Sequence, residues 1–252
     1  MKNLKSYSAI GGVFEYLNSD CDYLTWSQYL IKTLKRLNAG QEGVDVGCGN
    51  GYFTRALYKA GYSVKGMDIS PEMLSTAYEL ARKEGVCSEF LTGDITKLRL
   101  CGKVDFITAV NDCINYVPQD KLLSTFKGVY SNLKKGGVFL FDISSENKLK
   151  NIVGNNLFVK DLDRATVIWF NTFKGDRVEM DLTLFSLNDN GTYSRSDERQ
   201  TQYVHAEHDV LSALAEAGFA VETEGHLGGS KEERINFICR KPQSIQGRID
   251  KG

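Results

Sequence analysis

The chain has 252 residues, which is enough for one large domain to bury a core without the support of disulfides or a metal. Hydrophobic residues make up 42% and charged residues 25%, as in an ordinary soluble globular protein. Lysine plus arginine (31) nearly balances aspartate plus glutamate (32), so the net charge of −1 gives no general electrostatic reason to expect nucleic acid as the main partner.

The sequence carries no recognisable targeting or metal-binding signal. Its opening residues, MKNLKSYSAIGG, lack the apolar core of a signal peptide, and no apolar run is long enough to span a membrane. The six cysteines form no C-x-x-C pair and no cluster with histidine at a metal-ligand spacing. We therefore expect a cytoplasmic protein with no metal and no membrane contact.

Helical and extended patterns alternate over residues 1–142. An aromatic-rich helix is expected from Tyr23 to Leu37, and a later helix has Ser70 as its N-cap and Pro71 at its first position. Strands that alternate with helices indicate βαβ units and a mainly parallel sheet, the α/β class. The expected strands are 41–46, 63–69, 87–95, 104–110 and 136–143, and the other helices are 52–60, 71–84 and 121–133.

The pattern changes after Asp142. Consecutive strands are expected between residues 157 and 204, and in one of them Val178, Met180, Leu182 and Leu184 alternate with polar residues, as in a half-buried antiparallel strand. The α/β pattern then resumes. The expected strands of this insertion are 164–173, 177–187 and 192–204, followed by a helix at 207–217 and strands at 218–225 and 234–241. The domain prediction is therefore a main domain of 1–142 and 205–241, an inserted antiparallel β lid at 143–204, and a flexible tail at 242–252.

The segment VDVGCGNG, residues 44–51, carries the strongest functional signal. A strand that runs into Gly47, Gly49 and Gly51 makes a turn without side-chain bulk, so a ligand can lie against the backbone and a helix amino terminus. Asp68 ends the next strand, where a carboxylate can accept both hydroxyls of a ribose. Together these features predict a nucleoside-containing cofactor.

The spacing D-x-G-C-G-x-G from Asp45 resembles motif I of the class I S-adenosylmethionine-dependent methyltransferases, and differs from the dinucleotide pattern G-x-G-x-x-G. MDISPEML, GDI, NDCINYV and LKKGGVFLFD resemble later motifs of that family. The resemblance implies a Rossmann-like sheet of seven strands, the last one antiparallel, with S-adenosyl-L-methionine as cofactor. It also implies that Asp68 binds the ribose, that Ile69 and Met73 lie beside the adenine, and that Asp94 holds its exocyclic amine.

More narrowly, the chain resembles bacterial small-molecule methyltransferases with a β-stranded insertion after strand five, amino-sugar N-methyltransferases among them; the Y-x-x-W at Tyr23 also recurs there. Tyr23 and Trp26 read equally well as a helix core stripe, and charges on the last inserted strand read as a solvated edge. The expected cofactor contacts are Asp45, Gly47, Cys48, Gly49, Gly51, Asp68, Ile69, Met73, Asp94, Ile95, Asn111, Tyr23 and Trp26. The expected substrate contacts are Tyr7, Phe14, Asp112, Tyr116, Arg195, Arg199 and Tyr203, and His205 is a weak candidate base.

The resulting hypothesis is methyl transfer to a nitrogen or oxygen atom of a small molecule. A nucleic-acid methyltransferase is the first alternative, disfavoured because the fourth strand ends in NDCINY rather than in an N-P-P-Y or P-C motif. An NAD-dependent oxidoreductase is the second, disfavoured by the glycine spacing. The inserted strands are expected to wall the acceptor pocket, and a homodimer interface is the other use we consider for them.

Overall fold

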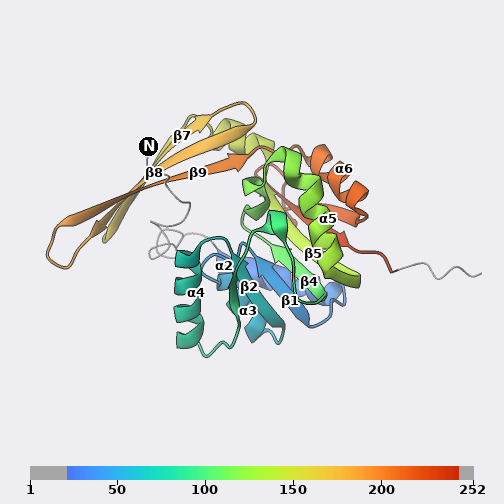
Figure 1. Ribbon diagram of the computed structural model, residues 1–252. Coiled ribbons are helices and arrows are strands. Elements are labelled where there is room, and N and C mark those ends of the chain that lie inside the picture. Colours follow the sequence, from blue (N-terminus) through green and yellow to red (C-terminus); the bar gives the residue numbers. More distant parts are fainter. Residues whose placement is uncertain (1–21, 244–252) are drawn as a thin grey trace, which may run out of the picture.

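The computed structural model describes residues 22–243 and contains two β-sheets (Figure 1). The main sheet has the strand order β10-β11-β5-β4-β1-β2-β3, in which β11 is antiparallel to both of its neighbours and the other pairs are parallel. This confirms the predicted Rossmann-like sheet of seven strands with an antiparallel last strand. Its strands are β1 Glu42–Val46, β2 Ser63–Asp68, β3 Phe90–Thr92, β4 Val104–Ala109, β5 Leu133–Ser144, β10 Ala220–Gly225 and β11 Arg234–Arg240.

Helices cover both faces of the main sheet. On one face α5 and α6 pack Phe126 and Leu214 against Phe139 and Phe141 of β5; on the other, α2 and α3 pack against residues that include Leu140. Neighbouring residues of β5 therefore point to opposite faces and are buried on both, which explains its continuous apolar run. The helices are α2 Tyr23–Arg36, α3 Tyr52–Lys59, α4 Pro71–Lys83, α5 Leu122–Asn132 and α6 Glu207–Ala217, each within one residue of its expected bounds.

Local signals in the sequence fix several element ends. Ser70 caps α4, because its hydroxyl oxygen accepts the backbone N–H of Met73 at 3.2 Å, and Pro71 occupies the first turn. The third strand is shorter than expected, because β2 pairs only with Phe90–Thr92 and the chain then enters a 3₁₀ turn, η2 Ile95–Lys97, capped by Asp94.

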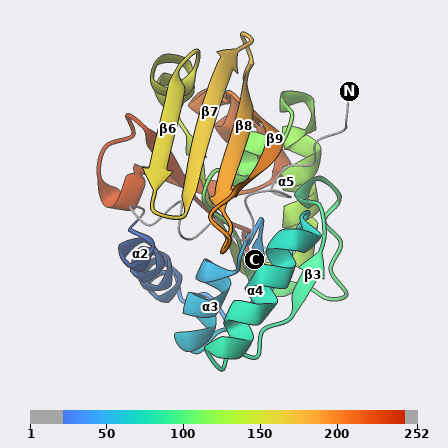
Figure 2. The ribbon, with the colours of Figure 1, turned by 90° about the vertical axis from the view of Figure 1, so that its left-hand side faces the viewer.

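The insertion forms a separate antiparallel sheet in the order β6-β7-β8-β9. Figure 2 shows the four strands side by side in front of the main domain. The first strand was missed by sequence reasoning, since exposed apolar residues such as Leu157 and Val159 give it no clear alternation. The strands are β6 Leu157–Leu162, β7 Ala165–Phe173, β8 Arg177–Leu187 and β9 Tyr193–Tyr203, preceded by a π-helical segment, η5 Lys148–Val153.

This second sheet has its own small core. Val178, Met180, Leu182 and Leu184 of β8 are buried together with Leu149 of η5, as their alternation predicts. Residues on the same face of β9 are polar yet buried, and the opposite face of that strand carries the predicted basic residues. The buried polar members are Glu198, Gln200 and Gln202.

The inserted sheet leaves the main domain after the carboxyl end of β5 and rejoins it through β9 (Figure 1). At that junction Asn115 of the 3₁₀ turn η3, Cys113–Tyr116, donates a hydrogen bond from Nδ2 to the carbonyl of Tyr203 at 3.0 Å. The hydroxyl of Tyr116 donates to Oε1 of Gln200 at 2.9 Å. These bonds fix the last inserted strand over the carboxyl edge of the main sheet.

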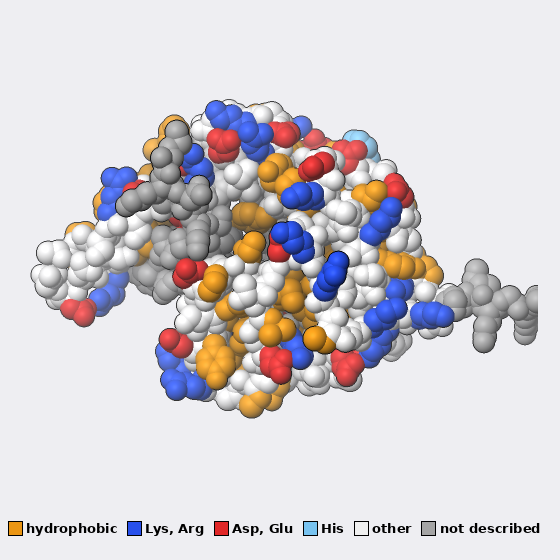
Figure 3. All heavy atoms as spheres, viewed as in Figure 1, with side chains coloured by type: hydrophobic (Ala, Val, Ile, Leu, Met, Phe, Trp, Pro, Cys, Tyr) orange, Lys and Arg blue, Asp and Glu red, His pale blue; other side chains and the backbone are white. Residues whose placement is uncertain are grey.

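Within residues 22–243 no helix combines the length and apolarity needed to cross a membrane. On the face drawn in Figure 3, basic and acidic side chains are interspersed. The expected tail, residues 242–252, lies almost entirely outside the described residues, as do Tyr7 and Phe14.

Candidate active site

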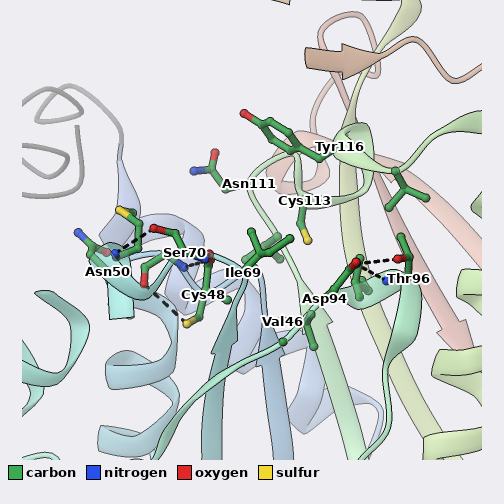
Figure 4. Close-up of a pocket in the computed structure, with 18 of the residues that line it drawn as sticks. Val46, Cys48, Asn50, Ile69, Ser70, Asp94, Thr96, Asn111, Cys113 and Tyr116 are labelled. Carbon is green, nitrogen blue, oxygen red and sulfur yellow. Dashed lines mark hydrogen bonds between the residues drawn. The ribbon is translucent and has the colours of Figure 1, made fainter. Parts of the chain in front are cut away.

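A cavity of about 760 Å³ opens at the carboxyl edge of the main sheet. Its walls come from the loop after β1, the ends of β2 and β4, the turn η3 and the inner part of β9. Figure 4 shows Cys48 and Asn50 of the loop, with Cys113 and Tyr116 of η3 above them. The strand order reverses between β1 and β4, and open α/β sheets bind ligands at such a switch point. The volume falls within the range of about 300–1,000 Å³ for small-molecule sites.

The three glycines of the loop have different tasks. All three have positive φ, at 70°, 56° and 77° for Gly47, Gly49 and Gly51. Gly47 and Gly49 line the cavity, and an added Cβ would approach Cys113 Sγ to 2.5 Å at Gly47. Gly51 does not line it: a Cβ there would meet the ring of Phe90 at 2.7 Å, so this glycine lets α3 begin close to β3. Gly51 thus has a packing role, and the ligand contact expected of it stays a prediction.

Asp68 lies at the end of β2 on the cavity wall. Its carboxylate accepts the backbone N–H of Gly49 at 2.8 Å and that of Ser70 at 2.9 Å. Burial raises the pKa of Asp68, and these backbone hydrogen bonds act in the opposite direction. Asp68 therefore joins the glycine loop to the start of α4 at the cavity wall.

Further expected contacts gather beside Asp68. Oδ1 of Asp94 accepts both the backbone N–H and the hydroxyl of Thr96, each at 2.8 Å, so the carboxylate has a fixed orientation. Figure 4 shows this pair below Cys113 and beside Val46. The other expected contacts that line this part of the cavity are Cys48, Ile69, Met73 and Ile95.

Polar side chains line the opposite part of the cavity. Arg199 and Tyr203 of β9 lie there as expected, with Thr201 between them on the same face of the strand. Arg199 donates from Nε to Oδ1 of Asp181 at 2.6 Å. Arg195, expected in the same set, does not line the cavity, and it pairs with Asp197 at 2.8 Å on the exposed part of the sheet.

The two aromatic residues of the Y-x-x-W sequence lie in different surroundings. Tyr23 lines the cavity, and its ring lies 4.9 Å from that of Tyr52. Trp26 is only 3% exposed and packs edge-on against Phe53 with ring centroids 5.3 Å apart. Trp26 therefore belongs to the core beneath α2, and the cofactor contact expected of it is corrected.

Asp45 also lies outside the cavity lining. It is buried below the glycine loop, where it accepts the hydroxyls of Thr54 at 2.7 Å and Thr108 at 2.8 Å. Burial raises its pKa to about 6, and these two hydrogen bonds oppose the shift. Asp45 thus supports the loop from beneath and does not provide the ligand contact expected from the motif.

His205 is fully buried and does not line the cavity. Its Nδ1 lies 2.6 Å from the side-chain oxygen of Gln119, and Nε2 lies 3.2 Å from the carbonyl of Ile114. Burial lowers its pKa, which favours the neutral ring. The weak candidate base is therefore corrected to a residue that fixes the turn beneath β9.

The two residues expected to bind ligands in the turn after β4 lie in different surroundings. Asn111 lines the cavity, and its side chain projects between the glycine loop and Tyr116 in Figure 4. Asp112, expected to bind substrate, turns away and pairs with Arg234, with Nη1 2.8 Å from Oδ1. Lining residues that sequence reasoning missed include Asn50, Cys113, Lys121 and Thr201; only Thr201 had a usable signal, since it alternates with Arg199 and Tyr203.

Comparison with known proteins agrees with this geometry. A family model described as a methyltransferase domain matches residues 44–137. The chain is 29% identical over 248 residues to a Geobacillus sp. (strain WCH70) protein whose name assigns it to the methyltransferases, covering 94% of this chain and all of that one. A solved S-adenosylmethionine-dependent methyltransferase from Clostridium acetobutylicum ATCC 824 is 30% identical, covers 94% of this chain and 100% of its own, and superposes with a TM-score of 0.85.

The chain belongs to the S-adenosylmethionine-dependent methyltransferases. Its cofactor is accordingly S-adenosylmethionine, as the motifs predicted. The sugar N-methyltransferase KedS8 from Streptoalloteichus sp. ATCC 53650 shares the fold, with a TM-score of 0.76 at 18% identity over 91% of this chain and 92% of that one.

The cavity of this methyltransferase fits such a cofactor. Two glycines leave the loop backbone open to the cavity, and a Cβ at Gly49 would come within 3.0 Å of the Met73 side chain. Asp68 lines the same cavity, and a carboxylate can accept hydrogen bonds from the hydroxyls that a nucleoside carries. The loop and the acid that the sequence predicted thus meet at one wall.

Proposed function

We propose that this methyltransferase transfers the methyl group to a nitrogen or oxygen atom of a small polar molecule held beneath β9. One observation carries the proposal: Arg199, Thr201 and Tyr203 line the same cavity as the glycine loop and Asp68. A pocket with apolar walls and a few convergent polar groups is typical of a small-molecule site. The name of KedS8, a sugar N-methyltransferase with the same fold, supports this class of acceptor.

In this proposal the cofactor lies along the loop. Asp68 accepts a ribose hydroxyl, because a carboxylate has about four acceptor positions and its bonds to the backbone of Gly49, Ser70 and Ile69 do not fill them all. Asp94 accepts from the adenine amine with its fixed carboxylate. The remaining residues contribute packing: Ile69, Met73 and Ile95 flank the adenine, and Gly47 and Cys48 lie along the methionine part.

S-adenosylmethionine supplies an activated methyl group, so the protein mainly orients the acceptor and excludes water. Tyr116 is suited to orientation, because its hydroxyl is held between Gln200 at 2.9 Å and Gln202 at 3.3 Å. Arg199 and Lys121 add positive charge to this wall. A general base is needed only for an acceptor that arrives protonated.

The inserted residues 143–204 act in this proposal as the wall of the acceptor pocket. One face of their sheet, which includes Val167, packs against Leu149, while Thr201 and Tyr203 in the part of β9 next to η3 line the cavity. On the face drawn in Figure 3, basic and acidic side chains are interspersed and form no continuous basic surface, which supports a small acceptor.

An acceptor screen tests the proposal. The purified protein is incubated with S-adenosylmethionine and with amino sugars, hydroxylated small molecules, or RNA and DNA oligonucleotides, while S-adenosylhomocysteine release is followed. We expect turnover with a small amine or alcohol, and none with oligonucleotides. Turnover that appears only with RNA or DNA would overturn the small-molecule assignment and leave the methyltransferase family unchanged.

A further inference from the structure

The turn that follows β4 has an unfavourable backbone. Asn111 and Asp112 both adopt positive φ, at 61° and 66°, in direct succession. Asparagine and aspartate tolerate this region better than other non-glycine residues, but they normally visit it one at a time. Two in a row at the carboxyl edge of the sheet call for an interaction that holds them there, since strained backbone gathers at functional sites.

A single carboxylate supplies that interaction. Asp142, at the end of the neighbouring strand β5, accepts the N–H of Asn111 on Oδ1 at 2.7 Å and that of Asp112 on Oδ2 at 3.2 Å. Successive N–H groups in this conformation form a concave anion site. The protein fills this one with its own buried side chain, since Asp142 is 1% exposed.

Arg234 of β11 completes the arrangement. Its Nη1 and Nη2 reach the two carboxylate oxygens of Asp112 at 2.8 and 3.1 Å, and Nη1 also contacts Oδ2 of Asp142. The guanidinium lies 4.9 Å from the ring centroid of Trp26. Ser144 donates its hydroxyl to Oδ1 of Asp112 at 2.8 Å. The turn is thereby tied to α2, β5 and β11.

We propose that Asp142 and Arg234 are positioning residues that hold the amide of Asn111 at the site of methyl transfer. None of the groups that bind Asp112 line the cavity, whereas Asn111 does, between the glycine loop and Tyr116 (Figure 4). The hydrogen-bonded turn thus presents one side chain to the cavity, that of Asn111, which borders both the cofactor part and the acceptor part.

Ligand binding tests this without an acceptor. Sinefungin carries an amine where S-adenosylmethionine carries its methyl group, whereas S-adenosylhomocysteine has neither. Asn111→Ala should lower the affinity for sinefungin by about ten-fold, which is the effect of one hydrogen bond to a charged group. The affinity for S-adenosylhomocysteine should fall by less than about three-fold. Asp142→Asn should also lower the affinity for sinefungin more than that for S-adenosylhomocysteine. The control Asp105→Asn, which alters a carboxylate bonded to the N–H of Glu42 at the opposite edge, should change neither affinity.

A double-mutant cycle separates positioning from general stability. If Asp142 acts through Asn111, the variant with both changes should bind sinefungin no more weakly than Asn111→Ala alone. Additive losses, or equal losses of sinefungin and S-adenosylhomocysteine, would overturn the proposal. Arg234→Lys, which keeps the charge but not the two-pronged bond to Asp112, replaces Asp142→Asn in the cycle should the latter not fold.

The inference rests on the cofactor placement proposed above, and the two fail differently. Unchanged S-adenosylhomocysteine affinity in Asp68→Ala would reject the placement. A normal loss in Asp68→Ala, together with unchanged sinefungin affinity in Asn111→Ala, would reject only the role of Asn111 and of the residues behind it.

Discussion

Asp45 offers a quantitative test of how the glycine loop is supported. Its carboxylate is 1% exposed and accepts hydroxyls from Thr54 and Thr108. Burial raises its pKa from 3.8 to about 6, so the folded state binds a proton more tightly than the unfolded state. The stability that this group contributes is therefore fully present below pH 3.8 and is lost as the pH rises through 6.

The substitution Asp45→Asn removes the titration while keeping the shape of the side chain. A shift of about two pKa units corresponds to about 3 kcal/mol at 1.36 kcal/mol per unit, taken as an order of magnitude for this buried group. Relative to the variant, the parent should lose up to about that free energy of unfolding between roughly pH 4 and pH 7, and nothing more above it.

Urea unfolding of both proteins at several pH values, without cofactor, measures this difference. Other titrating groups are shared by the two proteins and cancel when parent and variant are compared at each pH. A parent-minus-variant difference that is the same at pH 4.5 and pH 7.5 would refute the reasoning, because it would mean that Asp45 ionises in the folded protein as easily as in the unfolded chain.

Three further predictions concern the cavity. Asp68→Ala should lower the affinity for S-adenosylhomocysteine about ten-fold or more in titration calorimetry, since hydrogen bonds to charged groups contribute about 1.5–3 kcal/mol each. An unchanged dissociation constant would mean that the ribose binds elsewhere. Gly49→Val should abolish binding, because its φ of 56° and the nearby Met73 side chain exclude a branched residue, whereas Gly102→Val, with open space around it, should bind normally. Arg199→Ala should reduce turnover of the acceptor found in the screen without altering the affinity for S-adenosylhomocysteine. The control Arg195→Ala, which lies outside the cavity, should match the parent in both measurements. Equal effects of the two changes would contradict the assignment of the cavity wall.

Apart from β6, the order of helices and strands could be read from the sequence, because each of these elements is encoded within a short window. The cap at Ser70 and Pro71, the glycines after β1 and the alternation along β8 all act through neighbouring backbone or through one face of one element. Asp68 could be predicted for a similar reason. It ends β2, which runs parallel to β1, so it lies at the same edge of the sheet as the glycine loop.

Only the tertiary structure decided which polar residues face the cavity. Asp112 and Asn111 are neighbours in the chain, yet Asp112 turns toward Arg234, which is 122 positions away and invisible to any local pattern. The partners of Trp26 and Gly51 are also distant in the sequence: Trp26 packs against Phe53 in the core, and Gly51 packs close to Phe90. The sequence by itself determined the fold and the cofactor-binding loop, because these depend on backbone geometry; the roles of single side chains depended on partners that only folding brings within hydrogen-bond distance.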